Sequence, residues 1–148
     1  MPYEKVKICG INTSKLKVLN EKEKRELLIK ARNGTDSEKK MAREALIKGN
    51  LRLVLSVIQK FTNRGENLDD LFQVGCIGLI KAIDNFDINL DVRFSTYGVP
   101  MIIGEIRRHL RDNNSIRVSR SMRDIAYKAM QVKEEMMLKN NKEPTIDE

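Results

Sequence analysis

The sequence predicts an all-α protein. Apolar residues recur at helical spacing along almost the whole chain, and no stretch shows the alternation of apolar and polar residues that half-buried strands require. Helix-breaking residues are scarce, with three prolines and eight glycines in 148 residues. Because 41% of the residues are hydrophobic and 33% are charged, a chain of this length can build one modest core under a solvated surface.

The first two helices are predicted from the residues at their ends. Asn20 and Glu23 form a capping pair, and the apolar stripe that follows them stops at Asn33-Gly34. A second helix can begin at Thr35 or Asp36.

The second helix is expected to continue, despite Gly49, through residues 51–61. These residues are apolar on nearly every side, which is typical of a helix central to the core. A turn around Gly65 follows, residues 68–83 form the next helix, and residues 85–93 form an exposed loop.

A further helix is predicted to begin at Phe94 or Ser95 and to end near Asp112. Pro100 lies within it and removes a backbone donor, so we expect either a bend there or a later start.

The two ends of the chain are less regular. Ser119 or Ser121 can cap a final helix that ends near Leu138, and the polar residues 141–148 are expected to fray. Residues 1–18 show no visible period.

The charges divide into two neighbouring segments of opposite sign. The chain has a net charge of +7, and residues 93–128 carry eight basic residues against three acidic ones. Residues 68–91 carry five aspartates and one lysine. A solvated face explains either run alone. Two adjacent runs indicate two partners, a polyanion for the basic segment and a basic protein surface for the acidic one.

Several classes of protein are disfavoured. Cys9 and Cys76 lie far apart without ligand-type neighbours, so we expect reduced thiols and neither a metal nor a cofactor. No window of eighteen apolar residues is present, and the first ten residues lack a signal-peptide core, so we expect a cytoplasmic protein without a membrane partner. Paired carboxylates such as Asp69-Asp70 lack a cluster of His, Cys or Ser, which leaves an enzyme the weakest hypothesis.

One stretch combines aromatic and cationic residues. Phe94, Ser95, Thr96 and Tyr97 open the helix whose other end carries Arg107, Arg108 and Arg111. Aromatic faces beside a cationic ridge hold unstacked bases and their phosphates. The stretch therefore predicts binding of single-stranded DNA.

Four segments together resemble region 2 of the bacterial sigma-70 family. They are Gly-Asn-Leu-Arg-Leu-Val-Leu-Ser (49–56), Asn-Arg-Gly (63–65), Asp-Leu-Phe-Gln-Val-Gly-Cys-Ile-Gly-Leu (70–79) and Arg-Phe-Ser-Thr-Tyr (93–97). The resemblance implies four parts: an N-terminal extension (1–18), a compact domain (19–114), a region 3.0 helix (115–140) and a tail (141–148). The compact domain consists of region 1.2, which forms a helix pair, and region 2. Regions 3.2 and 4 have no counterpart, so we expect an N-terminal part of such a factor.

The resemblance also implies a function. Members direct core RNA polymerase to promoters and open the −10 element, without being enzymes. The runs at residues 100–108 and 112–129 resemble the sporulation factors that act in the cytoplasm of the forespore, in which two sister groups remain possible. An anti-sigma factor is a further implied partner. A pure protein-interaction module remains the alternative, and it has no need of Tyr97 or Arg93.

The helix at residues 68–83 is implied to dock on the clamp helices of the polymerase's largest subunit. Its implied contact residues are Leu68, Asp70, Leu71, Gln73, Cys76, Ile77 and Ile80. Helical spacing places Asp70, Gln73 and Ile77 on one face, while Gly75 and Gly78 allow another helix to approach.

Implied DNA contacts centre on Tyr97, which stacks where the −11 adenine leaves the duplex. The residues around that base are Phe86, Asp87, Phe94 and Thr96, although Phe86 and Phe94 also suit the core. The implied pocket for the −7 thymine is lined by Asn50, Leu53 and Ser95, and Arg93 holds a phosphate of the same strand. The upstream edge of the −10 element is met by Met101, Gly104 and Arg107. The extended −10 element is met by Arg117, Arg120, Ser121, Arg123 and Asp124.

Two departures from housekeeping members change what is implied. Pro100 and Met101 stand where those members carry two tryptophans, and Asn89 and Leu90 replace basic residues. We expect Met101 to be a smaller apolar wedge, with weaker melting and a different −10 preference.

Overall fold

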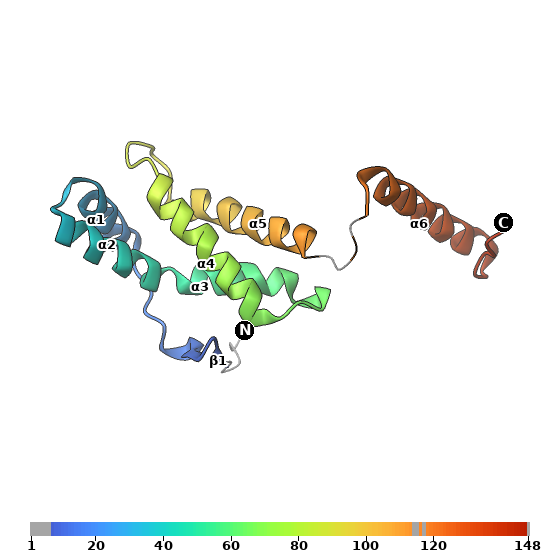
Figure 1. The fold of residues 1–148 in the computed structure, drawn as a ribbon, viewed down its shortest axis with the longest axis horizontal. Helices are drawn as coiled ribbons and strands as arrows, with labels where there is room; N and C mark the ends of the chain where they lie inside the picture. Colours follow the sequence, from blue (N-terminus) through green and yellow to red (C-terminus); the bar gives the residue numbers. More distant parts are fainter. Residues whose placement is uncertain (1–6, 114–115, 117, 148) are drawn as a thin grey trace. The chain divides into compact units, whose positions relative to one another are not determined.

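Residues 7–113, 116 and 118–147 are described by the computed structural model, and most of them are helical (Figure 1). The α-helices are α1 (Glu21–Asn33), α2 (Asp36–Gly49), α3 (Leu51–Ile58), α4 (Leu68–Asn85), α5 (Phe94–Asp112) and α6 (Arg120–Asn140). Shorter elements are the strands β1 (Lys7–Ile8) and β2 (Ile11–Asn12) and the 3-10 helices η1 (Thr13–Lys15) and η2 (Gln59–Arg64). The predicted all-α class is confirmed, with one four-residue β-ladder added. The chain divides into two units between Asn113 and Asn114.

Capping pairs begin α1, where the pair was predicted, and α2, where only the start at Thr35 or Asp36 was predicted. The side chain of Asn20 accepts the backbone N–H of Glu23 at 2.8 Å, and the Glu23 carboxylate accepts the N–H of Asn20 at 2.8 Å. Thr35 and Glu38 form the same reciprocal pair at the start of α2. These contacts satisfy backbone donors that have no partner inside the helix.

The prediction of one helix from residue 36 through residue 61 is wrong, because the chain turns at Asn50. Asn50 has φ −113° and ψ 9°, and its Nδ2 donates to the carbonyl oxygen of Leu46 at 2.8 Å. A Cβ at Gly49 would lie 2.2 Å from Cδ1 of Leu19, so this glycine is required for close packing. Beyond Ile58 the chain tightens into η2, which ends at the predicted turn, where Gly65 has a φ of 75°.

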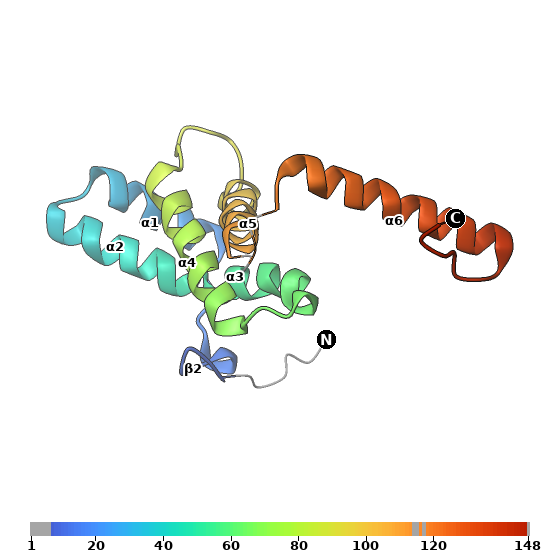
Figure 2. The ribbon, with the colours of Figure 1, turned by 45° about the vertical axis from the view of Figure 1, so that its right-hand side comes forward.

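The core of the first unit lies where α3, α4 and α5 pack together (Figure 2). Its fully buried side chains include Leu46, Ile58, Leu71, Leu79, Ile102 and Ile106. Two glycines of α4 make the packing close. A Cβ at Gly75 would lie 2.6 Å from Cγ1 of Val54, and a Cβ at Gly78 would lie 2.7 Å from Cα of Ile102.

Two predicted ends need correction. Helix α4 continues two residues past the predicted end, to Asn85, and the loop that follows buries Phe86 rather than being exposed throughout. Helix α5 begins at Phe94 and contains Pro100, so the alternative of a later start is wrong. A bend at Pro100 stays a prediction.

The N-terminal segment folds into a tight hairpin that the sequence pattern did not predict. Ile8 pairs with Ile11, and the two turn residues between them, Cys9 and Gly10, have φ values of 49° and 75°. Positive φ at both positions is the geometry of a type I′ turn. Ile8 is buried in the core, but two-residue strands are too short to show a period.

The second unit consists of α6 and the residues around it. Ser119, one of the two predicted caps, accepts the N–H of Met122 at 3.3 Å. Past α6 the described tail is not helical, and Glu143 pairs with Lys133. Within the described residues, no helix combines the length and the apolar character needed to cross a membrane.

Replacing Gly78 with Ala should destabilise the protein by about 1–3 kcal/mol, because the new methyl group meets the backbone of α5. Gly104→Ala is the matched control, since nothing lies within 4 Å of a Cβ there, and it should stabilise by about 0.5–1 kcal/mol. Urea unfolding followed by circular dichroism measures both changes. If the Gly78→Ala variant is as stable as the parent, α4 and α5 can move apart enough to accept the methyl group at no cost in stability.

Candidate functional site

Three aromatic rings meet where α4 ends and α5 begins. The ring of Phe86 lies 5.5 Å from that of Phe94 and 5.7 Å from that of Tyr97, both edge to face. Phe86 and Phe94 are 4% and 2% exposed, whereas Tyr97 is half-buried. Edge-to-face contacts hold rings in fixed relative positions. Phe86 therefore supports Tyr97 from the core side and itself packs against Phe94, and Tyr97 offers the accessible aromatic surface.

Polar residues surround this aromatic cluster on the solvent side. Asp87, Arg93 and Thr96 are exposed, and Ser95 is half-buried. Oδ1 of Asp87 accepts both the backbone N–H and the side-chain Nδ2 of Asn89 at 2.9 Å, which shapes the start of the loop between α4 and α5.

Two further predicted DNA-contact residues, Asn50 and Leu53, differ in burial. Asn50 is 2% exposed, and its amide already caps α2, so it serves the core in this structure. Leu53 is half-buried and faces α5, where its Cδ2 would lie 3.9 Å from a Cβ at Gly98. Leu53 therefore lies near α5, whereas Asn50 is buried.

A groove of about 510 Å³ runs beside the aromatic cluster, and sequence reasoning missed it. One wall comes from α1, with Lys22, Lys24 and Arg25, and the other from the loop that ends at Arg93. The remaining lining residues are Glu21, Leu28, Phe86, Ile88, Leu90, Asp91, Val92 and Phe94. Four of its lining residues are cationic, two are acidic and six are apolar. The basic residues of α1 were the available signal, but only the tertiary fold brings them opposite the loop.

The C-terminal half of α5 carries the cationic residues Arg107, Arg108 and Arg111. Arg107 and Gly104 are exposed and Met101 is half-buried. Glu105 lies among the cations, with Oε1 2.7 Å from Nζ of Lys81 and 3.9 Å from Nη1 of Arg108.

The exposed face of α4 contains part of the predicted docking set. Asp70, Gln73 and Ile77 are exposed, as their spacing predicts, and Ile77 is 48% exposed. Leu68, Cys76 and Ile80 are half-buried beside them, whereas Leu71 is 0% exposed and packs inside the core. Leu71 therefore supports this face from within.

The hairpin lies against the N-terminal part of that face, which sequence reasoning did not foresee. The N–H of Cys9 donates to Oδ1 of Asp69 at 3.0 Å, and Nε2 of Gln73 lies 3.9 Å from Sγ of Cys9. Burial, and secondarily Cys9, raises the pKa of the Cys76 thiol to about 11. Both cysteines are free.

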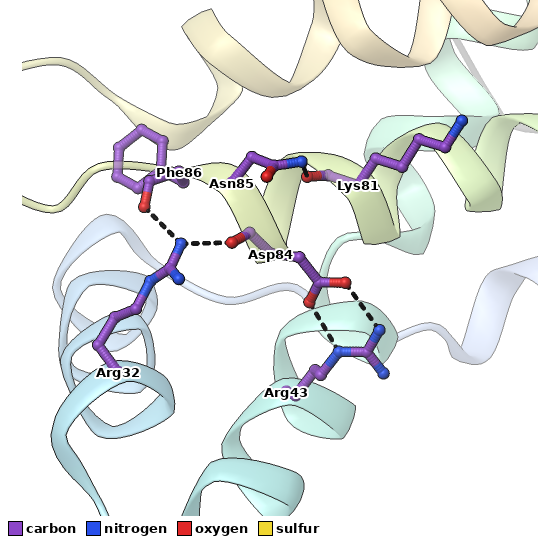
Figure 3. Close-up of polar contacts among 6 residues, drawn as sticks. All are labelled: Arg32, Arg43, Lys81, Asp84, Asn85 and Phe86. Atoms are coloured by element: carbon purple, nitrogen blue, oxygen red, sulfur yellow. Dashed lines mark hydrogen bonds and ion pairs between the residues drawn. The ribbon is translucent and has the colours of Figure 1, made fainter.

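A polar network joins the helix pair to the end of α4 (Figure 3). Arg32 of α1 donates to two backbone carbonyl groups there, and Arg43 of α2 forms a bidentate ion pair with Asp84 at 2.8 and 2.9 Å. The hydrogen bonds from Arg43 lower the pKa of Asp84 from its ordinary value.

The second unit holds the remaining predicted contacts. Arg120, Ser121, Arg123 and Asp124 are exposed in the first turns of α6, and Arg117 lies outside the described residues. Across the described part of the chain, no three His, Cys, Asp or Glu residues are grouped so that they could hold a metal ion.

Comparison with known proteins identifies the family of this chain. The family described as Sigma-70 region 2 matches residues 46–116. The chain is 67% identical over 129 residues to a provisionally named RNA polymerase sigma-G factor of Bacillus thuringiensis subsp. kurstaki, a match that covers 87% of this chain and all of that protein. The chain belongs to the sigma-70 family.

Other relatives resolve the two sister groups that the sequence left open, which are sigma-G and sigma-F. Residues 6–16 resemble sigma-G in sequence. Identity is 72% over 148 residues with the sigma-G factor of Clostridium acetobutylicum and 50% over 130 residues with the sigma-F factor of Bacillus licheniformis. The greater similarity to sigma-G factors is confirmed. The chain spans about half the length of these two relatives, 56% and 49%.

The sigma-70 match covers only part of the site. Residues 46–116 include α3, α4 and α5, and therefore the aromatic cluster and the exposed face of α4. Helix α1, which supplies one wall of the groove and Arg32, lies outside the matched segment.

Thiol labelling should separate the two cysteines of the folded protein. Cys9 is exposed and should react at once at pH 8, whereas roughly one Cys76 thiol in a thousand is ionised there if its pKa is about 11. The Cys76 rate should rise about tenfold per pH unit until the pH nears 11. Mass spectrometry of the Cys9→Ser variant follows Cys76 alone. Equal rates for both thiols in the folded protein would contradict the burial of Cys76.

Proposed function

We propose that the chain is the part of a sporulation-specific transcription initiation factor that binds core RNA polymerase and recognises and melts the promoter −10 element. It acts in the cytoplasm of the forespore to direct gene expression, and it catalyses no reaction itself. The observation that carries this proposal is the presence, in one family-matched unit, of an aromatic cluster and an exposed acidic face on different surfaces of α4 and α5. The names of the sigma-G relatives support it.

The aromatic cluster suits capture of an unstacked base. Stacking on an aromatic ring contributes about 1–3 kcal/mol per base, which offsets much of the cost of unstacking it. Tyr97 supplies the accessible ring, and Asp87, Thr96 and Arg93 supply polar contacts around it. Because the buried ring of Phe86 packs against Tyr97, the ring of Tyr97 is positioned before DNA binds.

The strand continues from this cluster along two cationic surfaces. The groove between α1 and the loop takes the downstream nucleotides, with Arg93, one of its lining residues, on a phosphate. Outside the groove lining, Leu53 and Ser95 contact the −7 thymine. Met101, Gly104 and Arg107 meet the upstream edge. In the second unit, Arg117, Arg120, Ser121, Arg123 and Asp124 contact the extended −10 element.

The exposed face of α4 binds the clamp helices of the polymerase's largest subunit. Asp70 pairs with an arginine of that subunit, Gln73 donates a hydrogen bond, and Ile77 packs beside them. Close packing of Gly75 and Gly78 on neighbouring helices fixes this face in place. An anti-sigma factor that covers the same face is a second proposed partner.

The composition of the DNA surface points to weak melting. Met101 is half-buried in α5, so less apolar area is available to wedge the upstream fork than a pair of tryptophans would offer. Asn89 and the exposed Leu90 add no positive charge near the base pocket. The chain therefore depends on polymerase to hold the opened strand.

The two faces should separate in a binding experiment with core RNA polymerase and a fluorescent single strand that carries a −10-like sequence. Asp70→Ala should lose the polymerase, whereas Tyr97→Ala should keep the polymerase and lose about tenfold or more in strand affinity, because stacking is removed. Glu44→Ala is the control, since Glu44 is an exposed acidic residue outside both proposed surfaces. If the chain is a pure protein-interaction module, Tyr97→Ala should have the same strand affinity as the parent. A chain that never binds polymerase would refute the proposal.

The salt dependence of strand binding should report the phosphate contact of Arg93. Replacing Arg93 with Ala should weaken binding by the polymerase complex and reduce the slope of log affinity against log salt by about 0.7, the value for one phosphate of a single strand. Tyr97→Ala should weaken binding without changing the slope. Anisotropy titrations between 50 and 300 mM salt, roughly the range over which such slopes are linear, give both numbers. An unchanged slope in Arg93→Ala would remove Arg93 from the phosphate contacts.

A further inference from the structure

Arg32 connects α1 to the point where α4 ends (Figure 3). Its Nη2 donates to the carbonyl oxygen of Asp84 at 2.6 Å and to that of Phe86 at 2.9 Å. The last carbonyl groups of a helix have no partner within it and carry partial negative charge. A guanidinium group is therefore a strong partner for both carbonyl oxygens.

One of these carbonyl groups belongs to the residue that supports Tyr97. Phe86 directs the chain out of α4 with φ −66° and ψ 128°, and its ring contacts both Phe94 and Tyr97. Arg32 thus holds the backbone of Phe86 on one side, while the rings of α5 hold its side chain on the other.

We propose that Arg32 is a positioning residue for recognition of the −10 strand. By fixing the backbone of Phe86, it sets the position of the ring against which Tyr97 packs, without touching DNA itself. The inference deepens the proposed function and rests on it. It also assigns to α1 a role that differs from lining the groove.

Arg43 provides a matched control within the same network. It also ties the helix pair to the end of α4, but both of its hydrogen bonds go to the carboxylate of Asp84. No hydrogen bond or ion pair recorded for the described residues links Arg43 to Phe86. Loss of Arg43 therefore removes another guanidinium connection between the helix pair and the end of α4, but leaves the hydrogen bond to Phe86 in place.

The test compares Arg32→Ala, Arg32→Lys, Arg43→Ala and Tyr97→Ala in the full chain with core RNA polymerase and the fluorescent −10-like strand. Arg32→Ala should lose at least about fivefold in strand affinity, because charged hydrogen bonds to the backbone of Phe86 are lost. Polymerase affinity should stay within about twofold in both arginine variants. Arg32→Lys should recover part of the loss, since it keeps the charge but not the fork. Arg43→Ala should bind the strand like the parent.

Two further measurements separate positioning from other roles. The salt slope of strand binding should not change in Arg32→Ala, whereas a direct phosphate contact would reduce it. In the free chain, the NMR signals of ¹³C-labelled phenylalanine rings and of Tyr97 should shift in Arg32→Ala and stay in place in Arg43→Ala. This second measurement needs neither DNA nor polymerase.

Several outcomes would overturn the inference. Equal loss of strand affinity in Arg32→Ala and Arg43→Ala would mean a general effect on stability, which thermal unfolding of both variants would show. A reduced salt slope would make Arg32 a DNA contact. If Tyr97→Ala weakens strand binding but Arg32→Ala does not, positioning fails and the proposed function stands. If Tyr97→Ala has no effect either, the proposed function fails with it.

Discussion

The close approach of α4 to α5 at Gly78 is the constraint on which both proposed surfaces depend. A Cβ at this position would meet the backbone of Ile102 at 2.7 Å, so the two helices touch through their main chains. Beyond that contact α4 ends at Asn85, and Phe86 lies against both Phe94 and Tyr97 of α5. The face of α4 with Asp70, Gln73 and Ile77 is exposed to solvent. The proposed nucleic-acid surface and the proposed docking surface thus share one closely packed helix pair.

The sequence predicts those parts of the fold that local chemistry determines. The capping pair of α1 was predicted, and Ser119 was one of the two caps predicted for α6, because a cap depends on residues within one turn. The break at Asn50 was not predicted, and Gly49 beside it packs against Leu19, which lies thirty residues away in the sequence. The hairpin was not predicted for a related reason, because Ile8 packs in the core through tertiary contacts that the sequence pattern does not show.

The candidate site divides in the same way. The resemblance identified residue types, whereas burial depends on tertiary packing that a single sequence does not display. Asn50 and Leu71 matched the family's pattern but lie inside, and Phe86 and Phe94 are nearly as buried as any core residue. Tyr97 differs from them because its position in the first turn of α5 leaves part of its ring open. The resemblance singled out Tyr97 and allowed Phe86 and Phe94 in the core, whereas the burial of Asn50 and Leu71 was not predicted.

The helix pair gives the site a second level of organisation that lies mostly outside the family match. Helix α1 supplies Lys22, Lys24 and Arg25 to the groove, while Arg32 from its last turn holds the end of α4. Exposed ion pairs such as that of Arg43 with Asp84 contribute little to stability, typically about 0–1 kcal/mol. Hydrogen bonds from Arg32 to backbone carbonyl groups act differently, because they fix main-chain position. In this unit, cationic side chains therefore have two proposed purposes: those on the groove attract the strand, and Arg32 positions the surface that receives it.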